Sequence, residues 1–476
     1  MNFNHFSVST LNYINSINLF ILFTIKQTMK MKKTIFSIAF LLFCMLIQAN
    51  NMLVQNVTTT GNDATNKTIQ VQFDLSWDNS WRDDINWDAA WIFMKFKDGS
   101  GNWQHAKLNT TGFANGTGTA NTVKVTADNI GCWVYRYANG SGTFNSTGMQ
   151  LQWNYGLSGL TSVTGLEIRV FAIEMVYVPE GEFNCTKMFF DNSEYCSNSR
   201  LFSAPGNNFP VINTKLTPTL TFNDGASSSI RIKGDAGIDS DNNGAVDNTS
   251  YPTGYRAFYC YKYELTEQQY ADFLNTLTAT QKTTLGVAGA SITLNNGVYF
   301  SSKPDFACGN ANKNRLLSYS DWSGVRPMSF LEINKASYGP QQPVFFQQAT
   351  CNGSPCGQYY AKYGYPTSGN GNFVIGLSKV GSLSTSTSTK AQSGVSYYGV
   401  FDLTGNAKEP IISFSYLTFN EMNGNGTLGS NGLTDHSQWT NLDVKYIEFS
   451  KTSGGGCNVG SNWSTELGFR YVRSAE

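Results

Sequence analysis

The sequence predicts an α+β protein in which an N-terminal all-β sandwich precedes a larger region with two short helices and little regular structure. Residues 69–77 alternate apolar and polar side chains with a period of two, which is typical of a half-buried strand. Further short strands, separated by Gly-, Asn- and Thr-rich turns, continue to about residue 173, so residues 50–173 are predicted to form the sandwich. Beyond residue 250, two helix-capping sequences mark the two helices.

Composition narrows the class of protein. The 476 residues are 41% hydrophobic and only 14% charged, a balance typical of β-rich, loop-rich extracellular proteins. Lys+Arg and Asp+Glu both number 33, so we expect no basic field for nucleic acid. The three histidines (His5, His105 and His436) are widely separated, which argues against chemistry or zinc binding that needs a histidine cluster.

The N-terminus carries an export signal. Three lysines precede an apolar run over residues 35–47, and a small residue, Ala49, follows. This pattern predicts a signal region over residues 1–49 with cleavage near Ala49. The run is too short to span a bilayer comfortably, so no transmembrane domain is expected after cleavage, and the protein is predicted to be secreted, periplasmic or at the cell surface.

Two alternatives remain for this segment. Residues 1–28 lie upstream of a plausible start at Met29 or Met31, so one interpretation is that the start is over-extended. The other is a membrane anchor with a long N-terminal region. The rest of the chain is divided into residues 50–173 and residues 174–476.

The cysteines suggest disulfides. Eight remain after removal of the signal region, and an even number in an exported chain favours a disulfide framework. The pairs Cys185/Cys196 and Cys351/Cys356 are predicted to be local loop staples, whereas the pairing of the other four cannot be deduced. Those four are Cys132, Cys260, Cys308 and Cys457.

The two predicted helices follow capping boxes. Thr266 and Gln269 form the first box, and apolar residues then recur at helical spacing. Ser329 and Glu332 form the second, which opens a helix through Ala336. Tryptophans crowd the N-terminal region, either as a sugar-stacking platform or, as we favour, as core packing. They are Trp77, Trp81, Trp87, Trp91 and Trp103.

Five blocks in one order resemble the formylglycine-generating-enzyme (sulfatase-modifying-factor) family. The second contains Lys-Tyr-Glu-Leu-Thr, the fourth Phe-Asp-Leu-Thr-Gly-Asn, and the fifth Gly-Phe-Arg-Tyr-Val. The resemblance implies a C-type-lectin-like α+β core over residues 174–476. The blocks cover residues 175–183, 261–274, 322–336, 398–409 and 467–472.

The family's activity is oxidation of a sulfatase cysteine to formylglycine, with copper(I) held by two cysteines five positions apart. Here Cys457 is the one candidate catalytic residue, because Thr452 and Asn462 stand five positions before and after it. A single thiolate cannot hold linear copper(I) and also exchange substrate. The sequence therefore argues against copper and leans against an enzyme, and Cys457 is better explained as half of a disulfide.

The resemblance also implies a structural calcium site at the fourth block. The matching ligand positions are Asp402, Gly405, Ala407 and Glu409, which offer the oxygen donors that a hard cation prefers. The alternative is a capped turn with two solvated acids.

A second calcium loop is predicted from the residues alone. Oxygen-bearing side chains stand at positions 1, 3, 5 and 9 of a loop that has Gly244 at position 6, while Ser250 replaces the usual glutamate at position 12. A solvated acidic turn is the alternative. The candidate ligands are Asp239, Asp241, Asn243, Ala245 and Asp247.

Together these patterns favour an exported, non-catalytic binding or structural protein with a protein or glycan ligand. The alternatives are a formylglycine-generating oxidase, a glycan-binding lectin-like protein, or a different enzyme on the same scaffold.

Overall fold

The structure of the protein is a computed structural model. The predicted signal region, residues 1–49, lies outside the described residues, so cleavage near Ala49 stays a prediction. The structure describes residues 51–184, 211–212, 250–340, 377–382, 395–403, 406–412, 419–439, 442, 444–449, 457–460 and 466–475.

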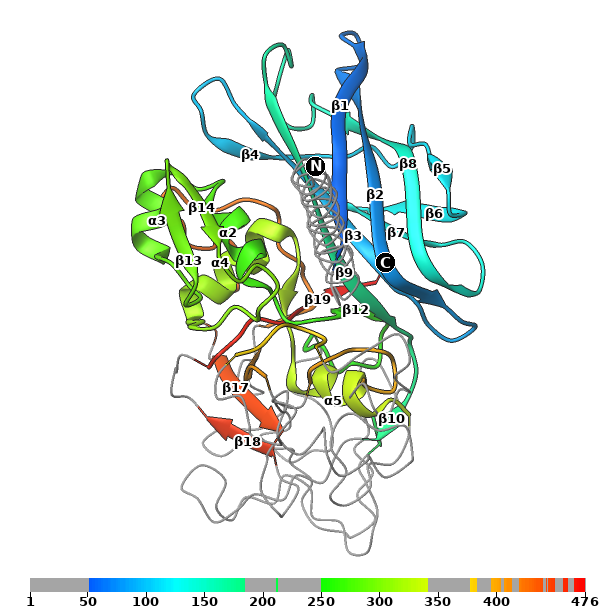
Figure 1. Ribbon diagram of the computed structural model, residues 1–476, viewed down its shortest axis with the longest axis vertical. Coiled ribbons are helices and arrows are strands. Elements are labelled where there is room, and N and C mark those ends of the chain that lie inside the picture. Colours follow the sequence, from blue (N-terminus) through cyan, green and yellow to red (C-terminus); the bar gives the residue numbers. More distant parts are fainter. Residues whose placement is uncertain are drawn as a thin grey trace, which may run out of the picture. The chain divides into compact units, whose positions relative to one another are not determined.

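The fold is mostly β, with 41% strand and 13% helix, and the named strands pair antiparallel throughout (Figure 1). A four-stranded sheet has the order β1 (Leu53–Asp63), β2 (Thr68–Arg82), β8 (Gly140–Asn154) and β5 (Thr117–Gly118). An eight-stranded sheet has the order β15 (Arg326–Pro327), β19 (Tyr471–Ser474), β12 (Phe258–Tyr261), β9 (Glu167–Val178), β3 (Asp88–Lys97), β7 (Cys132–Arg136) and β6 (Asn121–Val125), with β4 (Trp103–Ala106) paired to β3.

Three smaller sheets complete the described strands. They are β16 (Glu409–Ile412), β17 (Val444–Phe449) and β18 (Cys457–Gly460); the hairpin β13 (Ile292–Asn295) and β14 (Val298–Ser301); and the pair β10 (Phe183–Asn184) and β11 (Val211–Ile212).

The two large sheets share a core. Ile69, Val71 and Phe73 of β2 are buried, whereas the glutamines between them are partly exposed. These apolar side chains lie in one cluster with Ile92 and Met94 of β3. The alternation predicted for residues 69–77 is therefore confirmed, and it arises because one face of β2 covers the second sheet.

Strand β3 is buried on both faces. Ile92 and Met94 face the four-stranded sheet, while Trp91 and Phe93 belong to a second core that includes the helices. Every residue of β3 up to Phe96 is consequently buried. A strand covered on both sides needs a continuous apolar run instead of an alternating one.

The predicted boundary between residues 173 and 174 falls inside β9. Ile173 and Glu174 pair with Trp91 and Ala90 of β3. From Met175 onward, the same strand pairs with β12 on its other edge. The eight-stranded sheet thus runs without a break from the N-terminal region into the C-terminal region.

Four helices are described where two were expected: α2 (Glu267–Leu274), α3 (Ala279–Leu285), α4 (Lys313–Ser323) and α5 (Phe330–Tyr338). Both predicted capping boxes are confirmed, at Thr266 and at Ser329. In Figure 1, α2, α3 and α4 gather beside the hairpin β13–β14, while α5 lies near β10. Within the described ranges, no helix combines the length and the apolar character needed to cross a membrane.

Candidate functional site

The turn before β16 carries the first predicted calcium ligands. Asp402 and Asn406 have φ angles of 57° and 55°, a left-handed conformation that Asp and Asn tolerate better than most residues. Asn406 Oδ1 accepts a hydrogen bond from the backbone N–H of Ser378 at 2.9 Å, and its Nδ2 donates to Glu264. The turn is therefore held from two sides.

The structure brings three of the four predicted ligand positions to this turn. Asp402 is partly buried, and its Oδ2 accepts from the N–H of Gly381 at 2.5 Å. The N–H of Ala407 donates to Glu264 Oε1 at 2.7 Å. Glu409 opens β16 and is buried. Gly405, the fourth predicted position, lies outside the described residues.

Glu264 is the member that sequence analysis missed. It is 2% exposed and binds the turn through both carboxylate oxygens. Its neighbours Tyr263 and Leu265 are buried as well. An ionisable residue inside a buried aromatic and apolar segment was the available signal, because such a group needs dedicated partners.

A guanidinium faces these carboxyl groups. Arg470 Nε donates to Glu409 Oε1 at 3.1 Å, Nη1 donates to the carbonyl of Tyr261 at 3.1 Å, and Nη2 donates to that of Phe401 at 2.9 Å. Burial lowers the pKa of Arg470, but Glu409 and Glu264 outweigh that effect and raise it, so the arginine stays charged.

Burial raises the pKa of all three carboxyl groups at this turn. Burial raises the pKa of Glu264 well above its ordinary value, and the charges of Asp402 and Glu409 add to the shift. Burial also raises the pKa of Glu409 to about 8, against the opposing effect of Arg470. The pKa of Asp402 rises for the same reason, although the N–H of Gly381 opposes it. Three carboxyl groups thus share one guanidinium, a deficit that a divalent cation can offset.

The donor chemistry suits calcium, since every side chain offered is an oxygen donor. Each of the three carboxyl groups is already hydrogen-bonded or ion-paired to the protein, however. Among the described residues, no group of three or more His, Cys, Asp or Glu side chains is arranged to hold a metal ion. Calcium at this turn therefore remains a prediction for Asp402, Gly405, Ala407 and Glu409, and the structure adds Glu264 as a neighbour of the turn.

The second predicted calcium loop lies wholly outside the described residues. This applies to Asp239, Asp241, Asn243, Ala245 and Asp247, and their calcium binding stays a prediction.

Three cysteines have described side chains. Cys132, Cys260 and Cys308 are buried free thiols, so the disulfides expected of an exported chain are absent at these three positions. Burial raises the pKa of Cys260 to about 12. Cys457 lies in β18, where its backbone is opposite Phe449. The other predicted staples, Cys185/Cys196 and Cys351/Cys356, lie outside the described residues.

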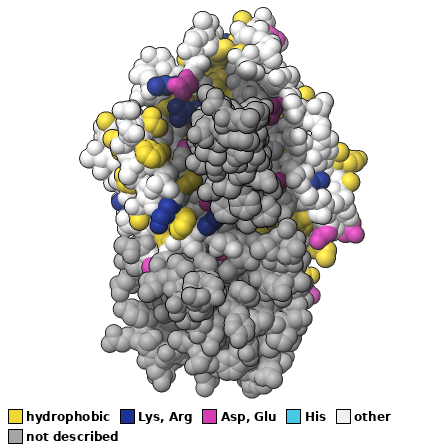
Figure 2. Space-filling model, viewed as in Figure 1, with side chains coloured by type: hydrophobic (Ala, Val, Ile, Leu, Met, Phe, Trp, Pro, Cys, Tyr) yellow, Lys and Arg dark blue, Asp and Glu magenta, His cyan; other side chains and the backbone are white. Residues whose placement is uncertain are grey.

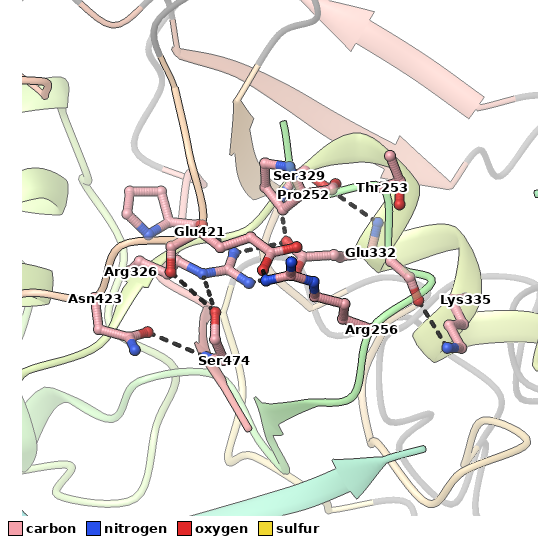
Figure 3. A network of polar contacts seen from close by, with 12 residues as sticks. Pro252, Thr253, Arg256, Arg326, Ser329, Glu332, Lys335, Glu421, Asn423 and Ser474 are labelled. Carbon is pink, nitrogen blue, oxygen red and sulfur yellow. Dashed lines mark hydrogen bonds and ion pairs between the residues drawn. The ribbon is translucent and has the colours of Figure 1, made fainter. Parts of the chain in front are cut away.

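Residues 326–335, within the third of the five sequence blocks, belong to a polar network (Figure 3). Arg326 forms a bidentate ion pair with Glu332, with nitrogen–oxygen distances of 2.8 and 2.5 Å. Ser329 donates to the carbonyl of Pro252 at 2.6 Å, and the Nε of Arg326 donates to Ser474 at 3.1 Å. These contacts connect β15, α5 and β19, so we interpret the network as one that stabilises the fold.

The tryptophans fit the packing interpretation. Trp77 and Trp91 are 1% and 0% exposed. Trp87 is covered on its ring by Tyr177 at 4.1 Å between centroids and by Arg82 at 4.4 Å. On the described part of the face in Figure 2, hydrophobic and charged side chains form small separate groups among the white atoms of the backbone and other side chains.

Comparison with known proteins adds no assignment. No family model matches this chain, and none of the curated proteins matches it.

Proposed function

We propose that this chain is an exported binding or structural protein whose residues 174–476 form a formylglycine-generating-enzyme-like domain without oxidase activity. In this proposal that region has a C-type-lectin-like α+β fold, and residues 50–173 form a β-sandwich that serves as a docking, adhesion or spacer module. The core shared by the two large sheets supports the sandwich.

One observation carries the loss of oxidase chemistry. Cys457 has Thr452 and Asn462 at the positions where the family's second cysteine would stand. Buried thiols of raised pKa, such as Cys260 and Cys308, are poor thiolates and do not supply a substitute.

Calcium is part of the same proposal, with a structural role. The resemblance implies Asp402, Glu409 and the backbone carbonyls of Gly405 and Ala407 as ligands. Glu264, which contacts the same turn, would add a further carboxylate oxygen. A bound cation would let these buried acids ionise together. The loop from Asp239 to Asp247 is proposed as a second, weaker site.

The oxidase alternative is tested with copper(I) and a cysteine-containing sulfatase peptide. We expect no conversion of the peptide cysteine to an aldehyde, and the same result for Cys457→Ser. Aldehyde formation by the native chain that disappears in Cys457→Ser, but not in the buried-thiol control Cys132→Ser, would overturn the proposal.

The ligand class is tested separately. Binding of the full chain to a glycan array that is lost on substitution of an exposed aromatic residue such as Tyr137, which is 70% exposed, would identify the lectin-like alternative. Absence of glycan binding together with capture of a defined protein would support a protein ligand.

A further inference from the structure

Lys262, Asp88 and Glu174 meet in a buried triad. Lys262 Nζ donates to Asp88 Oδ2 at 3.0 Å and also to Glu174 Oε1. The three side chains are 1%, 0% and 3% exposed, respectively. An amine and two carboxyl groups therefore lie within hydrogen-bonding distance in a place shielded from water.

The backbone fixes this meeting. Asp88 pairs with Val176 and Ala90 pairs with Glu174, so Asp88 and Glu174 are diagonal neighbours on one face of the β3–β9 ladder. The backbone N–H of Lys262, the residue after β12, donates to the carbonyl of Glu174 at 3.0 Å. Asp88 and Glu174 are thus held by paired strands, and Lys262 is held by a backbone hydrogen bond directly after a third strand.

The carboxyl group of Asp88 is oriented by three donors. Its Oδ1 accepts from the hydroxyl of Ser80 at 3.1 Å and from the N–H of Trp81 at 2.9 Å. Its Oδ2 accepts from the indole N–H of Trp77 at 3.2 Å. Two donors on one oxygen form the arrangement that stabilises an oxyanion when a nucleophile adds to the carboxyl carbon.

Glu174 is suited to move protons in this triad. Burial raises its pKa to about 8, against the opposing charge of Lys262, and a hydrogen bond to Asp88 adds to the rise. Its carboxyl group also accepts a hydrogen bond from Lys262 and lies beside Asp88, so it is placed to pass a proton between the two.

We propose that Lys262 and Asp88 condense to an intramolecular isopeptide bond, with Glu174 relaying the protons. Glu174 protonates Asp88 Oδ2 and receives a proton from the Lys262 ammonium, which leaves a neutral amine. The amine attacks Asp88 Cγ, and the oxyanion forms at Oδ1. Glu174 then transfers one amine proton to Oδ2, the Cγ–Oδ2 bond breaks, and one water molecule leaves while Glu174 ends protonated.

The buried site favours an amide bond between Lys262 and Asp88 over an ion pair between them. A well-oriented intramolecular nucleophile reaches an effective molarity of about 10⁵–10⁸ M, far above that of the water it releases. The reaction also converts buried charges into an amide, which removes the cost of keeping ions away from water. The bond would join residues that are 174 positions apart in the sequence.

The test is mass spectrometry of the reduced, denatured native chain. We expect the chain to be lighter by one water molecule than its sequence requires, and a branched peptide that contains both Lys262 and Asp88. Lys262→Arg and Glu174→Gln should restore the full mass. Glu332→Gln, at another buried ion pair, should keep the deficit.

A native chain of full mass without a branched peptide would overturn the proposal, and this measurement needs no variant to fold. A branch mapped to Glu174 instead would overturn the assignment of Asp88 as the acceptor. Asp88→Asn gives a further check, because the same condensation would then release ammonia and not water.

Discussion

Arg470 forms an ion pair with Glu409 at 3.1 Å, with both side chains almost fully buried, at 0% and 2% exposure. The same guanidinium donates to the carbonyls of Tyr261 and Phe401. One side chain therefore links β12, the turn at Asp402 and β16, and the stability of this region depends on it.

Substitution of Arg470 should be costly. Arg470→Met leaves Glu409 without its partner and two carbonyls without donors, so we expect a loss of about 3–5 kcal/mol in the free energy of unfolding. Urea unfolding measures it. The matched control is Arg256→Met, which removes a 2.7 Å ion pair whose arginine is 44% exposed and should cost about 0–1 kcal/mol. Equal losses would contradict this account.

Stability should fall as pH rises when calcium is chelated. Folding raises the pKa values of Glu264 and Glu409, so the folded chain holds these protons more tightly than the unfolded chain. Their contribution is complete below about pH 4.5 and is lost as pH rises toward about 8. Melting temperatures across that range measure the effect, and calcium should reduce the fall. Glu264→Gln should flatten the profile, whereas a profile unchanged by that variant would exclude Glu264 as the source.

A methyl group at Gly131 should not be tolerated. The added Cβ would lie 2.4 Å from the carbonyl oxygen of Ile92 and 2.6 Å from the ring of Trp91. We expect Gly131→Ala to cost about 1–3 kcal/mol through overpacking. Gly99→Ala is the control, since nothing lies within 4 Å of its added Cβ. Thermal unfolding distinguishes them, and equal melting temperatures would argue against this packing.

The two caps should differ in strength. Ser329 accepts from the N–H of Glu332 and also donates to the buried carbonyl of Pro252. Thr278 makes the corresponding cap for α3 in a half-exposed place. Both alanine variants should lose about 0.5–2 kcal/mol from the cap, and Ser329→Ala should lose more because it orphans the Pro252 carbonyl. Denaturant midpoints provide the comparison, and a larger loss at Thr278 would contradict it.

Secondary structure was predicted best from the sequence where an element has one buried face or a local capping motif. The alternation in β2 follows from its single buried face, and the caps at Thr266 and Ser329 are local. Helix α4 was missed because all residues from Leu316 to Ser323 are buried, including serines and Asp321, so no amphipathic stripe forms.

At the candidate calcium site, local sequence patterns again identified only part of the residues. Asp402, Ala407 and Glu409 belong to one short motif, whereas Glu264 lies more than a hundred residues earlier and reaches the turn through tertiary structure. Spacing within a motif cannot indicate such a partner. Likewise Lys262 meets Asp88 through sheet pairing, which no local pattern encodes.

Strand β9 has a consequence for how this protein can evolve. Its backbone pairs with β3 along one edge and with β12 along the other. Recombination between genes at this point would give each product an incomplete sheet with an exposed edge, which invites aggregation. The parts of the chain before and after β9 are therefore expected to be inherited together and not to be exchanged as independent domains.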